Sequence, residues 1–363
     1  VFIGIGTRYY EISQEVSIQD EAQMHRIVAN FFLPHTDNGD IDGAQATLVT
    51  KGTFSFKEGI EERTARIQVF YPPVTDGLSV NLQLTSKDER DLEDLVNLET
   101  CSLNIAAFLK LATMAGGSIL FSGVPGAGKS TLMGACAQEI PNVDPTGQVP
   151  PAEEGPAFVV AVQEVDEIPM HRLLYKQKFY SFEAAARTLG IERGSSGLGV
   201  AGGTSDLVEI MKVARGDRVV IGECRGSEMY DYLETASIFG GAMTTVHAKS
   251  PQQAINNAVQ FAMRNPNAAV AGLEGVRRLV AGGIDLVVHM EKVGDRRVIS
   301  EIVELDGTLT DGDIRSARLF VFNPSTGQWD RPQGSGLSDR DGRLLGKLKQ
   351  AGLPNLHANP IEG

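Results

Sequence analysis

The residues best suited to chemistry lie in a glycine-rich stretch, FSGVPGAGKST, which runs from Phe121 to Thr131. It satisfies the spacing G-x-x-x-x-G-K-[ST] of a phosphate-binding loop. Glycines at these positions let backbone N–H groups turn inward around a phosphate, and the helix that follows directs its positive dipole end at the same anion. The residues expected to hold the phosphates are Gly123, Pro125, Gly126, Ala127, Gly128, Lys129, Ser130 and Thr131. We therefore expect a nucleoside triphosphate, with Lys129 at its β- and γ-phosphates and Mg²⁺ on the Ser130 hydroxyl.

Polar residues that could act on such a phosphate follow later apolar runs. Glu223 ends the run in RGDRVVIGECRG, where its carboxylate could polarise water or hold Mg²⁺ through water, and Arg225 could pair with it or with phosphate. His247 ends TTVH, and Glu164 follows the run that ends at Val162. Each alone also fits an ordinary ion pair or a packed histidine. Their combination with a phosphate loop predicts one site, because the carboxyl ends of parallel strands meet at one edge of a sheet.

Short apolar strands and helical segments must position these residues. Four buried strands are expected over Ser118–Phe121, Phe158–Val162, Arg218–Ile221 and Met243–Val246. Helices are expected over Leu103–Ala115 and Thr131–Glu139. Strands of this length that alternate with helices indicate an α/β fold with a parallel sheet covered on both faces.

A smaller domain is expected before this sheet. Strands over Ala65–Phe70 and Leu78–Leu84 flank a Pro- and Gly-containing turn, and the charged stretch 86–91 has little to bury. We place an N-terminal α+β domain at 1–88, a P-loop domain at 89–322 and a C-terminal extension at 323–363.

Length and composition agree with this organisation and limit the partners. The 363 residues include 42% hydrophobic residues, enough for two cores, and carry a formal net charge of -13. That charge argues against direct nucleic-acid binding, which depends on Lys and Arg. No apolar run reaches the roughly 18 residues that span a bilayer. Cys101, Cys136 and Cys224 form no CxxC pair, which favours a reducing cytosol. The first residues lack an initiator Met and a signal sequence, as in a trimmed chain.

Four motifs in order resemble the type II/type IV secretion ATPase family: GVPGAGKST its Walker A motif, VQEVDEI its acidic box, RGDRVVIGECRG its Walker B region and TTVHAKS its His box. The resemblance covers about residues 60–330. Within the family, GECRG, DLVVHMEKVGDRRVISEIVEL and FNPSTGQW are most similar to the tight-adherence pilus branch, often called CpaF or TadA, with the conjugative VirB-type ATPases close behind.

The resemblance implies a RecA-like P-loop ATPase domain with a smaller PAS-like N-terminal domain, assembled as a homo-hexamer. It implies that ATP hydrolysis passes force to an inner-membrane platform protein, from a cytoplasmic position with only indirect membrane contact. It assigns Glu223 as Walker B glutamate and general base, Glu164 as the acidic-box carboxylate and His247 as the γ-phosphate sensor. Arg225 would couple Glu223 to neighbouring elements.

The chain departs from the family at SVNLQL, residues 79–84, where relatives commonly carry arginines that reach the nucleotide. Arg66, Lys87 and Arg172 are candidate substitutes. The acidic box reads Gln163-Glu164 where Glu-Asp is usual. These departures leave a nucleotide-dependent assembly switch open as an alternative to a motor. A nucleic-acid translocase and a small-molecule kinase are weaker alternatives.

Overall fold

A computed structural model shows how the chain folds. It describes residues 2–5, 8–11, 20–32, 49–58, 61–70, 76, 78–84, 90–141, 159–162, 179–181, 218–333, 336–339 and 343–354. The chain forms two compact units, Val1–Asp88 and Glu89–Gly363. Each unit is described by itself below.

The first unit contains two antiparallel sheets and a helix. Its elements are β1 (Phe2–Ile5), β2 (Arg8–Glu11), α1 (Glu21–Ile27), the π-helical turn Val28–Phe32, β3 (Val49–Glu58), β4 (Glu61–Phe70) and β5 (Ser79–Leu84). Strands β1 and β2 pair with each other, and β3, β4 and β5 form a second sheet. Val28, Ile67 and Val69 are fully buried at its centre. The strands expected over Ala65–Phe70 and Leu78–Leu84 correspond to β4 and β5.

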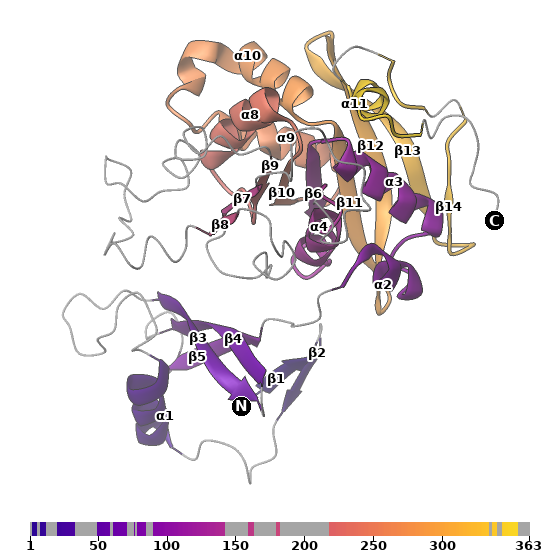
Figure 1. Ribbon diagram of the computed structural model, residues 1–363. Helices are drawn as coiled ribbons and strands as arrows, with labels where there is room; N and C mark the ends of the chain where they lie inside the picture. Colours follow the sequence, from indigo (N-terminus) through magenta and orange to yellow (C-terminus); the bar gives the residue numbers. More distant parts are fainter. Residues whose placement is uncertain are drawn as a thin grey trace. The chain divides into compact units, whose positions relative to one another are not determined.

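The second unit is built on one nine-stranded sheet of order β14-β13-β12-β11-β6-β10-β9-β7-β8 (Figure 1). Six of its strands run parallel: β6 (Ile119–Gly123), β7 (Val159–Val162), β8 (Phe179–Ser181), β9 (Arg218–Ile221), β10 (Ala242–His247) and β11 (Leu286–Val293). Three further strands extend the sheet beyond β11 with antiparallel pairing. They are β12 (Arg296–Thr310), β13 (Asp313–Asn323) and the short β14 (Gln328–Asp330).

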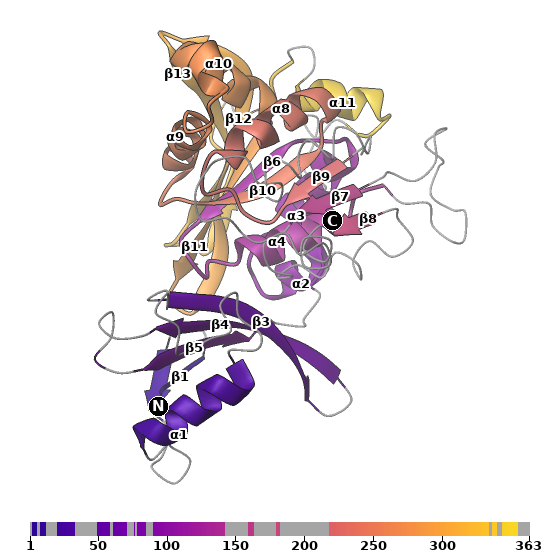
Figure 2. The same cartoon turned by 90° about the vertical axis from the view of Figure 1, so that its left-hand side faces the viewer.

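Helices cover both faces of this sheet (Figure 2). On one face lie α2 (Leu92–Asn97), α3 (Leu103–Met114), α4 (Lys129–Ala137) and α11 (Leu344–Gln350). On the other lie α8 (Glu228–Phe239), α9 (Pro251–Ala262) and α10 (Ala268–Gly283). Side chains that alternate along β6 contribute to the hydrophobic core on each face of the sheet. Ile119 and Phe121 pack against the first group of helices, and Leu120 packs against the second. Every β6 residue is buried, and residues 119–121 form a continuous apolar run, as in a strand covered on both faces.

The expected parallel sheet with helices on both faces is confirmed. The four predicted strands match β6, β7, β9 and β10 within one or two residues at each end, and the two predicted helices match α3 and α4. The antiparallel half of the sheet was not predicted. Within this half, Trp329 of β14 bonds to β12, because its Nε1 donates to the Ile299 carbonyl at 2.6 Å.

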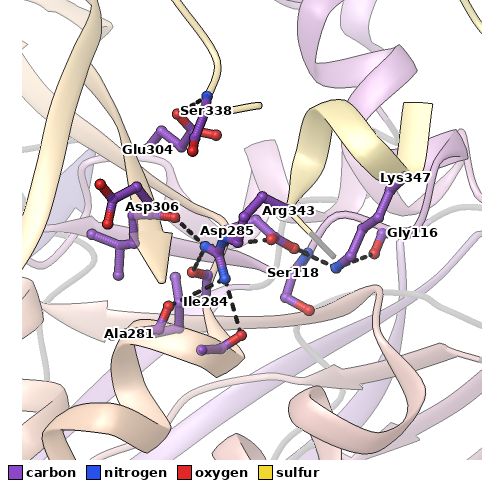
Figure 3. A network of polar contacts seen from close by, with 12 residues as sticks. Gly116, Ser118, Ala281, Ile284, Asp285, Glu304, Asp306, Ser338, Arg343 and Lys347 are labelled. Carbon is purple, nitrogen blue, oxygen red and sulfur yellow. Dashed lines mark hydrogen bonds and ion pairs between the residues drawn. The ribbon is translucent and has the colours of Figure 1, made fainter. Parts of the chain in front are cut away.

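A buried ion cluster fixes helix α11 to the amino-terminal edge of the parallel strands (Figure 3). Asp285 lies at its centre: its Oδ2 accepts from Lys347 Nζ at 2.6 Å and from the Ser118 backbone N–H at 2.8 Å. The Arg343 guanidinium lies 3.4 Å from Asp285 Oδ1 and also donates to the carbonyls of Ala281, Gly282, Ile284 and Leu305. Because Leu344 and Leu348 are fully buried beside it, the residues assigned to a C-terminal extension complete the core.

Glu304 borders the same cluster. Its carboxyl group makes the free energy of unfolding of the protein depend on pH. Its side chain is 1% exposed and its Oε2 accepts from the Ser338 N–H at 2.8 Å, whereas Oε1 has no hydrogen-bond partner among the described residues. Burial raises the pKa of Glu304 from 4.5 to about 7, despite the Ser338 N–H and nearby Arg343, which lower it; Asp285 and Asp306 raise it further. A carboxyl with a raised folded-state pKa destabilises the fold as pH rises from 4.5 through 7.

Glu304→Gln should therefore stabilise the protein at alkaline pH. We expect its free energy of unfolding to exceed that of the wild type by about 1–2 kcal/mol at pH 8, and the difference to vanish near pH 4.5. Urea unfolding at the two pH values measures this. Glu274→Gln, at an exposed Glu274–Arg278 pair, is the control and should show no such pH-dependent gain. An equal effect of Glu304→Gln at both pH values would contradict the assignment.

No helix in the described parts of the chain has the length and apolar character needed to cross a bilayer.

Candidate active site

The predicted phosphate loop joins the end of β6 to the start of α4. Gly123, Gly126 and Gly128 have φ values of 152°, 72° and 98°, which favour glycine. Gly128 is the N-cap of α4 and offers no side chain, so the first N–H groups of the helix remain available to an anion. The loop is closed by a hydrogen bond of 3.1 Å from the Ala127 N–H to the Val124 carbonyl.

Gly123 is required for a packing reason as well. A Cβ at this position would lie 2.5 Å from the Met290 carbonyl oxygen of the neighbouring strand β11. We expect Gly123→Ala to lower the free energy of unfolding by about 2 kcal/mol or more, because strain and a backbone clash add. Gly282→Ala is the matched control, since a Cβ there meets nothing within 4 Å, and helical Gly→Ala changes tend to stabilise. Thermal unfolding of both variants tests this, and equal melting temperatures would contradict it.

Lys129, which follows β6, contacts His247, which ends the neighbouring strand β10. Lys129 opens α4 and is 6% exposed, and its Nζ donates to the Val124 carbonyl at 3.2 Å and lies 3.0 Å from His247 Nδ1. His247 Nδ1 also lies 3.4 Å from the Gly123 carbonyl oxygen. His247 ends β10, which pairs with β6 so that His247 lies opposite Gly123. A phosphate at the loop would meet both side chains.

Glu223 extends this chain of contacts by one strand. Its Oε1 lies 2.9 Å from His247 Nε2, and its Oε2 accepts from Arg225 at 2.6 Å. Burial by itself raises the pKa of Glu223, but the hydrogen bonds and charges of His247 and Arg225 outweigh it and lower the pKa from 4.5 to about 2. The carboxylate is therefore ionised throughout the physiological range. Lys129, His247 and Glu223 form a continuous polar row across the ends of β6, β10 and β9.

The loop after β9 is held by backbone and side-chain hydrogen bonds. The Cys224 N–H donates to the Thr245 carbonyl at 3.0 Å, and Thr245 Oγ1 donates to the Gly222 carbonyl at 2.9 Å. Glu228 accepts from the N–H groups of Arg225 and Gly226. These contacts fix Glu223 to the His247 strand, so the distance between the two side chains is set by the sheet.

The residues present fit Mg²⁺ bound with a nucleotide. Mg²⁺ in such sites takes one or two protein oxygens and several phosphate and water oxygens. The Ser130 hydroxyl is partly exposed at the start of α4, and no hydrogen bond to another described residue engages it. No group of three or more His, Cys, Asp or Glu side chains that could hold a metal occurs among the described residues. The ion would therefore depend on Ser130 and the phosphates, with Glu223 reachable through water.

Some predicted residues lie outside the described part of the chain. Glu164, Gln163, Lys87 and Arg172 belong to this group, and Arg66 is described only by its backbone, in β4. The family's arginine strand corresponds to β5, where the exposed Asn81 donates to Gln68 at 3.3 Å. The predicted Glu164 contribution remains a prediction.

Two features of the site were not predicted. Arg297 Nε donates to the Gly126 carbonyl at 3.0 Å from strand β12. Beneath the loop, the Ser122 hydroxyl lies 2.8 Å from Nδ1 of His289, which is buried on β11. Burial lowers the pKa of His289. The DLVVH motif contains this histidine, but spacing alone does not reveal that it lies beside Ser122.

The second unit has a RecA-like P-loop fold, defined by its phosphate loop between β6 and α4 and its sheet covered on both faces. No family model matches the sequence. Type IV secretion system protein PtlH from Bordetella pertussis is 29% identical over 205 residues, 55% of this chain and 53% of that protein. Type IV secretion system protein VirB11 from Brucella suis is 27% identical over 271 residues, 65% of this chain and 67% of that protein.

The chain thus spans about half the length of PtlH, and it is similar to type IV secretion proteins. Among solved structures, the Legionella pneumophila ATPase DotB superposes with a TM-score of 0.55 at 14% identity, covering 90% of this chain and 75% of that one. This likeness supports the fold.

Proposed function

We propose that the chain is an ATPase of the secretion and pilus motor class, and that it couples ATP hydrolysis to the export or assembly of protein. The observation that carries the proposal is the polar row of Lys129, His247 and Glu223, which ends at a phosphate loop. The ATPase in the name of the structural neighbour and the secretion system in the names of PtlH and VirB11 support the same reading.

In this proposal each residue of the polar row has a separate role in binding or hydrolysing ATP. Lys129 leaves His247 and Val124 to bind the β- and γ-phosphates, while the α4 N-terminus receives the anion. Mg²⁺, held by Ser130, would neutralise charge on the phosphates. His247, released by Lys129, senses the γ-phosphate. Glu223 orients the attacking water.

The low pKa of Glu223 constrains its part in hydrolysis. A carboxylate with a pKa of about 2 is a weak base, because the best general bases have a pKa near the working pH. When His247 turns toward a γ-phosphate, Glu223 loses one of the two partners that lower its pKa. ATP binding would then raise the proton affinity of Glu223 at the moment when the water must be activated.

The assembly and the partners follow from the class proposed. A homo-hexamer would act on an inner-membrane platform protein from the cytoplasmic side, with no direct contact to lipid or nucleic acid. On its motifs, GECRG and the DLVVH strand above all, we assign the chain to the tight-adherence (CpaF or TadA) pilus branch. Glu164, Arg225 and the remaining loop residues complete the proposed site.

A conjugative type IV secretion ATPase is the second candidate. It is favoured by the similarity to VirB11 and to the conjugal transfer protein TrbB of Rhizobium radiobacter, 22% identical over 249 residues. A nucleotide-dependent assembly switch is the third, because β5 carries Asn81 and Gln83 where relatives commonly place arginines.

Steady-state ATP hydrolysis by the purified full chain, measured with and without Mg²⁺, tests the proposal. We expect Mg²⁺-dependent release of phosphate at a rate well above that of the Lys129→Ala variant. Tight ATP binding without turnover would favour the switch. Stimulation by single-stranded DNA would favour a nucleic-acid translocase, which the net charge of -13 opposes.

A further inference from the structure

The turn between β11 and β12 brings two basic residues, Lys292 and Arg297, to the phosphate loop. Lys292 on β11 lies directly opposite Arg297 on β12, and Arg296 is next to it in sequence. Arg297 Nε donates to the Gly126 carbonyl at 3.0 Å, and its Cδ lies 3.2 Å from the position of a Cβ on Gly128. Lys292 Nζ lies 3.3 Å from the position of a Cβ on Gly126. Lys292 and Arg297 form a basic hairpin tip that touches the loop.

The order of strands indicates which end of a bound nucleotide would face this hairpin. Strand β6 has β10 and then β9 on one side and β11 and then β12 on the other (Figure 1). His247 and Glu223, proposed to act at the γ-phosphate, belong to the β10–β9 side. A triphosphate that crosses the loop with its γ end toward these residues must extend its nucleoside end toward β11 and β12.

The charges at the hairpin tip point to an anion as well. Like charges directly opposite each other on paired strands are destabilising, and Lys292 and Arg297 are such a pair. Arg296 is engaged elsewhere, with its NH1 3.2 Å from Glu99 Oε2 and its NH2 donating to the Glu99 carbonyl. No hydrogen bond or ion pair to any described residue engages Lys292. An anionic group beside Gly126 would relieve this repulsion and pair with the ammonium.

We propose that the basic hairpin tip binds the nucleoside end of the nucleotide: Lys292 contacts the α-phosphate, and Arg297 is a positioning residue that holds the loop through Gly126. The inference rests on the proposed function, because it takes the γ end from His247 and Glu223. It adds a binding element from the β11–β12 hairpin, which contains none of the four motifs.

Calorimetric titration of the full chain with two probes tests the proposal. MgADP carries an α-phosphate beside the phosphate that fills the loop, whereas inorganic phosphate offers only a single phosphate to the loop. We expect Lys292→Gln to weaken MgADP binding about tenfold and inorganic phosphate binding less than about twofold. Lys292→Arg, which keeps the charge, should restore most of the MgADP affinity. Arg296→Gln is the matched control and should bind both probes as the wild type does.

Replacement of Arg297 should change the affinities for the two probes in a different way from replacement of Lys292, because Arg297 acts through the loop. Arg297→Gln should weaken both probes to a similar degree, since the loop that holds every phosphate is loosened, while the melting temperature of the free protein stays within about 2 °C of the wild type. Arg297→Lys, which lacks the Nε donor, should restore little.

Three outcomes would overturn the proposal. Unchanged MgADP affinity in Lys292→Gln would show that Lys292 makes no contact with the nucleotide, and equal losses for MgADP and inorganic phosphate would place its contact at the loop phosphate and not at the α-phosphate. Wild-type affinity in Arg297→Gln would remove the positioning role. These results would leave the proposed function standing if the wild type binds MgADP, whereas a wild type that binds neither MgADP nor MgATP would overturn both.

Discussion

Lys129→Ala is expected to reduce kcat/KM for ATP by at least about two orders of magnitude. Lys129 is the one cation inside the phosphate loop, and its Nζ lies 3.0 Å from His247 Nδ1 and 3.2 Å from the Val124 carbonyl. Its replacement removes the positive charge that meets the β- and γ-phosphates. The loop N–H groups remain, so weak residual binding of ADP is expected. Phosphate release at saturating and limiting ATP measures the effect.

Lys110→Ala is the control, because its exposed ammonium pairs with Glu139 at 2.8 Å and lies outside the site. It should keep full activity. Circular dichroism must show that Lys129→Ala is folded. A folded Lys129→Ala variant that hydrolyses ATP at the wild-type rate would contradict the assignment of the loop.

Glu223→Gln is expected to separate binding from hydrolysis. Gln keeps the size of the side chain and can still accept from Arg225, but it loses the negative charge that orients and accepts a proton from water. We expect kcat to fall by about 10²–10⁴-fold while ATP affinity changes little. A single-turnover assay and an equilibrium titration with MgATP measure the two quantities separately.

The contacts of Glu223 with its neighbours set a condition for this assay. Arg225 and His247 would lose a charged partner 2.6 and 2.9 Å away, so modest destabilisation is expected and the variant must be assayed below its melting temperature. Glu274→Gln makes the same chemical change at an exposed helix pair and should leave kcat unchanged. Loss of ATP binding in Glu223→Gln, with turnover per bound ATP intact, would refute the proposed role.

The parallel half of the fold could be predicted because its strands are short apolar runs. Ile119, Leu120 and Phe121 are all buried, and a run buried on both faces is recognisable without tertiary information. The antiparallel half was harder to predict because burial does not alternate regularly along its strands: residues 302–306 of β12 are all buried, residues 313–318 of β13 are mostly exposed, and bulges interrupt their pairing near Ile302 and Leu305. Their order in the sheet depends on pairings that periodicity does not contain.

The same distinction holds in the site. Lys129, Glu223 and His247 were predicted to lie together because each follows a parallel strand, and in the structure His247 lies within hydrogen-bond distance of both Lys129 and Glu223, following the order β6, β10, β9 in the sheet. The contact of Arg297 with Gly126 was not predictable, because the two residues are 171 positions apart and join through an antiparallel hairpin. Ser122 and His289 are likewise 167 positions apart.

The buried cluster around Asp285 bears on how the second unit folds during synthesis. Arg343 and Lys347 supply the two cations for Asp285, and Leu344 and Leu348 fill the core beside it. Until residues 343–350 have been made, a nascent chain would hold a carboxylate in an apolar setting without its counter-charges and with an open core. Cooperative folding of this unit should therefore wait until helix α11 has left the ribosome, and nascent chains stalled before Arg343 should be more sensitive to protease than chains stalled after α11.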